Sequence, residues 1–229
     1  MENPVSAALN VRNMAFTLEE LSSQQDPGAR LSTLLALDRR ASRLLDQRSH
    51  VLKSDIIPVY HNTMGALFLK CLSGPESQPI HWASQQMVLL TASGDHFSKA
   101  LQYLTENRVT PPRKALELSA ALHLNMAQAA IHLKDPAAAS DHLDQALDAA
   151  REGLLPEYEW RVLAYQGHFQ KALKVLESVS ILTADCAPCE ITRAFGPLVL
   201  KWMDNGEVEQ AFNLMERISE IERIHRMSP

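Results

Sequence analysis

The feature that most constrains this chain is a short pattern that occurs four times along it. Each copy begins with a turn-forming residue and runs into a helical segment with an alanine at a fixed place. A large apolar residue follows four positions later. The copies span residues 94–104, 134–146, 167–176 and 205–215, and their alanines are Ala100, Ala139, Ala172 and Ala211, at steps of 39, 33 and 39 residues. Such self-similarity is typical of helical repeat proteins, whose units bury their apolar faces against one another.

Apolar residues recur at i, i+3, i+4 and i+7 between clusters of turn-forming residues, which is the spacing of an amphipathic helix. No stretch alternates convincingly at period two, so no sheet is predicted. A second helix is expected before each repeated turn, over about 82–92, 114–133, 157–166 and 191–204. The alanines are expected where paired helices cross, because helices approach closely only over short side chains. The predicted fold class is all-α, an α-solenoid of antiparallel helix hairpins.

These units resemble the tetratricopeptide repeat family, whose repeat is a helix–turn–helix of 34 residues. The four alanines match its central small position, Ala127 a small position in a first helix, and Pro112 the repeat-ending proline. Trp160 departs from the pattern, standing where a small residue is expected. The resemblance covers about residues 80–223. It implies about four hairpins over 80–229. Residues 1–79 match the pattern poorly and are expected to form an N-terminal helical segment, with helices near 14–21, 30–54 and 58–72 that pack on the first repeat, as one or two degenerate hairpins.

Composition excludes several classes of function. The formal charge is −5, from 22 basic and 27 acidic residues, which argues against a nucleic-acid binder because phosphate recognition needs clustered cations. No apolar run approaches the roughly 20 residues of a membrane-spanning helix. The N-terminus does not resemble a signal peptide, and 3 cysteines do not suggest a disulfide framework. We therefore expect an intracellular protein, cytoplasmic or nuclear, with no membrane span.

The pair Cys186 and Cys189 is the one motif that invites an enzymatic interpretation. A Cys-x-Pro-Cys pair can be a redox dithiol, but that chemistry usually follows a strand, and none is predicted. A structural zinc needs four ligands and this pair supplies two. The nine histidines are scattered, and we interpret them as surface or groove residues. The chain is thus expected not to be an enzyme and to hold no cofactor or metal. A small thiol-redox or metal protein is the alternative from another class.

The predicted function is a protein-interaction scaffold or adaptor that is a subunit of a multiprotein complex. A dedicated chaperone for one client is the alternative among binding proteins. The first helices of the hairpins are expected to line a concave groove that binds the partner. Two side chains assigned to this groove, Trp82 and Tyr165, fit a core between repeats equally well. The last helix carries Val208, Phe212, Met215, Ile218 and Ile221, more apolar surface than one neighbour covers, which predicts a homodimer or complex contact. The predicted partner-binding residues are Trp82, Gln85, Gln86, Leu89, Asn125, Gln128, His132, Glu157, Tyr158, Arg161, Tyr165, Phe212 and Met215.

Overall fold

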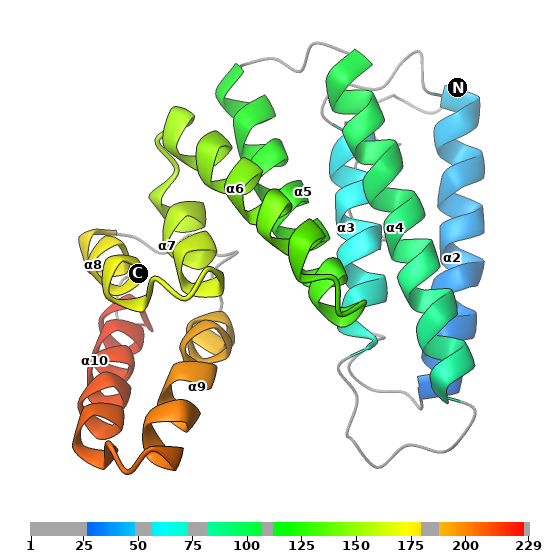
Figure 1. Cartoon of the computed structure of the whole chain (residues 1–229). Coiled ribbons are helices and arrows are strands. Elements are labelled where there is room, and N and C mark those ends of the chain that lie inside the picture. Colours follow the sequence, from blue (N-terminus) through cyan, green and yellow to red (C-terminus); the bar gives the residue numbers. More distant parts are fainter. Residues whose placement is uncertain (1–26, 49–55, 73–81, 107–111, 180–187, 227–229) are drawn as a thin grey trace. The chain divides into compact units, whose positions relative to one another are not determined.

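The computed structural model describes residues 27–48, 56–72, 82–106, 112–179 and 188–226, and every regular element within these ranges is an α-helix (Figure 1). The all-α prediction is therefore confirmed. The helix predicted near 14–21 lies outside the described residues. The helices are α2 Pro27–Arg48, α3 Ile56–Lys70, α4 Trp82–Glu106, α5 Pro112–His132, α6 Pro136–Glu152, α7 Pro156–Tyr165, α8 Phe169–Ser178, α9 Pro188–Asp204 and α10 Val208–Arg226.

The chain forms two compact units, Met1–His142 and Leu143–Pro229. In the first unit, α3 packs against α2, α4 and α5. In the second, α7 packs against α8 and α9, and α9 packs against α10. The predicted boundary between residues 79 and 80, which separates repeat-like from other sequence, stays a prediction.

Proline marks the start of five helices. The pyrrolidine ring fixes φ near the helical value, and its missing N–H is not needed in the first turn, where amides have no intrahelical acceptor. The same residue therefore ends the preceding connection and begins the next helix. These prolines are Pro27, Pro112, Pro136, Pro156 and Pro188.

Four helices end in the same three-residue turn. Its middle residue has positive φ: Gly167 (79°), Gly206 (78°), Lys134 (58°) and Leu154 (51°). The amide after that residue donates back to a carbonyl five residues earlier, as from His168 to Leu163 at 2.8 Å, a Schellman-type closure. The next helix begins two residues after the positive-φ residue each time. Three of the four copies of the sequence pattern therefore coincide with real turns.

The first copy of the sequence pattern, at Gly94, does not coincide with a turn. The sequence predicts a helix over 82–92 and a turn at Gly94, whereas α4 continues without a break from Trp82 to Glu106. Gly94 does not adopt the positive φ that ends α7 and α9. Residues on both sides of it are buried in the same core, Leu89 before it and Phe97 and Ala100 after it. This shared packing outweighs the roughly 1 kcal/mol that a helical glycine costs relative to alanine.

The repeated alanines are core residues. Ala100, Ala139, Ala172 and Ala211 are all at most 5% exposed, as expected of small side chains at helix contacts. Trp160, which occupies an expected small position, is fully buried and stacks on Phe195 of α9, with ring centroids 6.3 Å apart and planes 9° apart. This repeat position thus accommodates a large residue because α9 supplies an aromatic surface for it.

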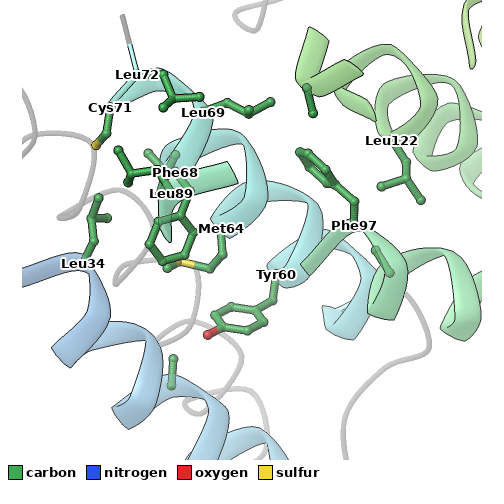
Figure 2. Packing of buried hydrophobic residues seen from close by; sticks show 14 of the residues in the cluster. Leu34, Tyr60, Met64, Phe68, Leu69, Cys71, Leu72, Leu89, Phe97 and Leu122 are labelled. Atoms are coloured by element: carbon green, nitrogen blue, oxygen red, sulfur yellow. The ribbon is translucent and has the colours of Figure 1, made fainter. Parts of the chain in front are cut away.

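The core of the first unit is built around α3 (Figure 2). Its buried residues Tyr60, Met64 and Phe68 lie on one helix face, at i, i+4 and i+8. Gly65 lies against α4, because a Cβ built there would overlap the ring of Phe97. Its carbonyl also accepts a hydrogen bond from Ser93 Oγ at 2.9 Å. At this crossing, therefore, no side chain fits on α3.

Two glycine-to-alanine substitutions test these two helices in opposite directions. We expect Gly65→Ala to destabilise the protein by roughly 1–3 kcal/mol, because overlap with Phe97 outweighs the gain in helix propensity. Gly94→Ala should stabilise it by roughly 0.5–1 kcal/mol, because α4 is helical there and no neighbouring atom lies within 4 Å of the new methyl group. Urea denaturation followed by circular dichroism measures both changes. A loss of stability in Gly94→Ala would show that α4 is interrupted at that residue.

Candidate functional site

The predicted partner-binding residues of α4 and α5 are only partly available to a ligand. Leu89 is 1% exposed and belongs to the core. Contrary to the prediction, it is not available as a surface contact. Asn125 donates through Nδ2 to Asn62 Oδ1 on α3 at 2.9 Å, which commits its side chain to packing between helices. Of the remaining predicted residues, Gln86 and Gln128 are half-buried, His132 is exposed, and the side chains of Trp82 and Gln85 lie outside the described residues.

Two of the predicted residues of α7, Tyr158 and Arg161, pack against one another. The Arg161 side chain is largely buried. Its guanidinium carbon lies 5.5 Å from the ring centre of Tyr158 and 5.7 Å from that of Trp160, within cation–π range. Arg161 therefore packs within this unit, and its predicted role in partner binding stays a prediction. Glu157 and Tyr165 are half-buried.

Apart from Leu154, the exposed large apolar residues described in the second unit all lie on its last two helices. We define the α9–α10 apolar surface as Leu200 and Met203 on α9 with Val208, Phe212 and Met215 on α10. Their exposed fractions run from 45% to 64%, and Phe212 is 56% exposed. The five lie on either side of the turn 205–207, where α9 and α10 join (Figure 1). The predicted exposure of Phe212 and Met215 agrees with the structure. Leu200 and Met203 were not predicted.

The apolar side of α10 has a second row of residues, which is buried. The buried row is Ala211, Leu214, Ile218 and Ile221. Contrary to the prediction, Ile218 and Ile221 therefore do not belong to the exposed surface. The buried row and the exposed row are neighbours around the helix, since residue 208 and its i+4 and i+7 partners lie beside the 211, 214 and 218 row. The apolar sector of α10 is thus wider than the contact with α9.

A second candidate site lies inside the first unit, where α2, α3 and α4 meet. Asp38 Oδ1 accepts a hydrogen bond from the Tyr60 hydroxyl at 2.7 Å and lies 3.2 Å from His96 Nε2. His96 Nδ1 lies 2.9 Å from His61 Nδ1. The ring of His96 is 4% exposed and stacks on Phe68 with centroids 5.7 Å apart. The four polar side chains therefore form one connected network across three helices.

The hydrogen-bond roles in this network follow from the carboxylate at its end. An ionised Asp38 can only accept, so His96 donates through Nε2, and a neutral His96 then accepts at Nδ1. His61 consequently donates its Nδ1 proton and keeps a lone pair on Nε2. This assignment is the one that satisfies every contact. The result is a chain from Asp38 to a half-buried imidazole whose outer nitrogen is a base or a ligand atom.

Burial sets the charge state of the network. The pKa of His61 is lowered to about 4, chiefly by burial and then by electrostatic repulsion from His96 and Lys99, against the opposing effect of Asp38. Burial by itself raises the pKa of Asp38, but hydrogen bonds from His96 and Tyr60 outweigh it, so the pKa of this carboxyl is lowered. At neutral pH, therefore, Asp38 is ionised and His61 is uncharged.

A second histidine pair joins α5 to the start of α6. His123 and His142 stack with ring centroids 5.5 Å apart, and their Nδ1 atoms are 3.4 Å apart. Burial, and then the charge of His142, lower the pKa of His123 to about 4. The interpretation of all histidines as surface or groove residues is therefore wrong for His96 and His123, which are both buried.

The remaining chemistry predicted from the sequence can be placed briefly. Cys186 lies outside the described residues, as does the side chain of Cys189. Within the described ranges, no group of three or more metal-binding side chains is arranged to hold an ion. Nor does any described helix combine the length and apolarity needed to cross a membrane.

The two histidine pairs predict acid sensitivity. An unfolded chain protonates these imidazoles near pH 6.5, whereas in the folded protein His61 and His123 stay neutral down to about pH 4. Unfolding therefore takes up protons within this window, and the free energy of unfolding falls as pH falls from 6.5 towards 4. The slope is at most about 1.4 kcal/mol per pH unit for each proton. Urea unfolding at a series of pH values measures it.

His61→Gln removes one of these protons and should flatten that slope, even if it lowers stability at pH 7. The matched control is His168→Gln, because His168 is exposed and belongs to neither pair. Equal slopes in wild type and His61→Gln would contradict a neutral His61 in the folded protein.

No protein-family model, curated protein or solved structure gives a significant match to this chain. The resemblance to the tetratricopeptide repeat family therefore rests on the repeat residues themselves, the alanines and the turns at 134, 167 and 206.

Proposed function

We propose that this chain is a non-enzymatic protein-binding subunit of the tetratricopeptide-like type, which holds a partner against its C-terminal helices. The carrying observation is the α9–α10 apolar surface. Large apolar side chains that stay about half exposed on neighbouring turns are typical of protein interfaces. Covering Val208, Phe212 and Met215 would gain roughly 1 kcal/mol for each side chain.

The proposed repeat architecture is supported by the turns and by the small residues. Three copies of the sequence pattern coincide with a three-residue turn that has positive φ at its centre, and all four repeat alanines are buried. In a stack of helix hairpins each unit needs a neighbour on both sides. The open flank of α10 would accept such a neighbour.

A double substitution tests this proposal. Phe212→Glu with Met215→Glu places two charges on the surface, and because both side chains are exposed, helix content and melting temperature should stay close to wild type. Partner capture should be lost. The measurement is quantitative mass spectrometry of proteins retained from native extract by wild type and by the double variant.

The matched control is Leu154→Glu, which puts the same charge on a 79% exposed leucine outside this surface. It should retain the same proteins as wild type. The proposal fails if the double variant retains them too, or if the purified wild type is a monomer in light scattering and binds no hydrophobic dye.

A further inference from the structure

The open apolar row of α10 has an acidic edge. Val208, Phe212 and Met215 follow one another at i, i+4 and i+7 and are all exposed. Glu209 lies three residues before Phe212 and Glu216 four residues after it, so both are its neighbours on the helix surface. Both glutamates are exposed. A partner that covers Phe212 therefore meets a carboxylate on the turn before it and another on the turn after it.

The described arginines of α10 do not neutralise this edge. Arg217 pairs with Glu177 of α8, and Arg223 pairs with Glu220 at 2.7 Å. Both cations are thus engaged with other carboxylates. Neither Glu209 nor Glu216 takes part in an ion pair within the described part of the chain.

The shape of the row indicates a helix as occupant. Three apolar side chains at i, i+4 and i+7 span about 10 Å along α10, which is two turns of a second helix packed side by side. Helix-in-groove recognition uses this spacing of anchors. An extended strand, whose side chains alternate with period two, offers no matching set of contacts.

A second copy of this chain is a poor occupant. In a two-fold interface that pairs two α10 helices antiparallel around Phe212, Glu209 of one helix lies near Glu216 of the other. The two acidic edges then repel each other, and like charges placed together across an interface disfavour that pairing. A partner with cations beside its apolar stripe meets the same edge favourably.

We propose that the α9–α10 apolar surface takes an amphipathic helix of another protein whose apolar stripe is flanked by lysine or arginine. This inference rests on the proposed function and adds the charge of the partner to it. The apolar row supplies affinity, and Glu209 and Glu216 select the partner and speed its association.

Two synthetic helical peptides of roughly 18 residues test the charge selection. They share one leucine stripe at i, i+4, i+7 and i+11 and differ only in carrying lysine or glutamate at the flanking positions. Fluorescence anisotropy with the full chain should give a Kd for the lysine peptide roughly three- to tenfold lower at low salt, the range expected of two exposed ion pairs. The difference should vanish at 1 M salt, where the screening length is about 3 Å.

Variants of the full chain separate the two claims. Glu209→Lys with Glu216→Lys should reverse the preference, and Phe212→Glu with Met215→Glu should weaken binding of both peptides by at least tenfold. Circular dichroism checks that each variant is folded. Equal affinity for the two peptides, or no reversal by the lysine variant, overturns the charge inference, while partner capture that still depends on Phe212 would leave the proposed function standing. A dimer that dissociates on substituting Phe212 would also overturn it, since a second copy would then cover the surface.

Discussion

The three-residue turn with a left-handed residue at its centre decides how the second half of this protein is built. At Gly167 and Gly206 the amide after the glycine closes on a carbonyl five residues back, and the next helix begins two residues later. At these two connections the following helix packs on its predecessor, α8 on α7 and α10 on α9. The buried alanines at these crossings have short side chains, which allow the paired helices to approach closely.

The sequence predicts these turns well where a local signal decides them and fails where packing does. Gly94 and Gly167 are followed by nearly the same residues: His and Phe first, and then Lys-Ala-Leu. One lies inside a continuous helix and the other ends a helix. The difference arises from α3, whose Gly65 lets Phe97 approach so closely that both halves of α4 share one core. No local propensity contains that information, because the deciding residue lies about 30 positions away.

The same distinction applies to the candidate sites. Phe212 and Met215 could be predicted as exposed because the apolar sector of α10 is visibly wide for one neighbour. Leu89 and Arg161 could not be assigned, since their burial depends on which helices surround them. The network of Asp38, His61 and His96 was missed for another reason: its members are 23 and 35 residues apart on three helices. A search for metal-ligand spacing within one helix does not find these three residues together. The usable signal was the occurrence of polar residues within apolar stretches.

The network and the open row of α10 show two ways in which the hydrophobic effect limits this fold. The half-buried carboxylate of Asp38 is tolerated because Tyr60 and His96 replace hydrogen bonds of water, and the arrangement requires α2, α3 and α4 to meet in one register. On α10 no polar group replaces what is missing, and the row at Phe212 keeps apolar surface in water at a cost to stability. The first case is satisfied within the unit itself. In the second case no described part of the chain covers the row, and the proposed partner would do so. Glu209 and Glu216, which form no ion pair within the described residues, would then favour a partner with cations.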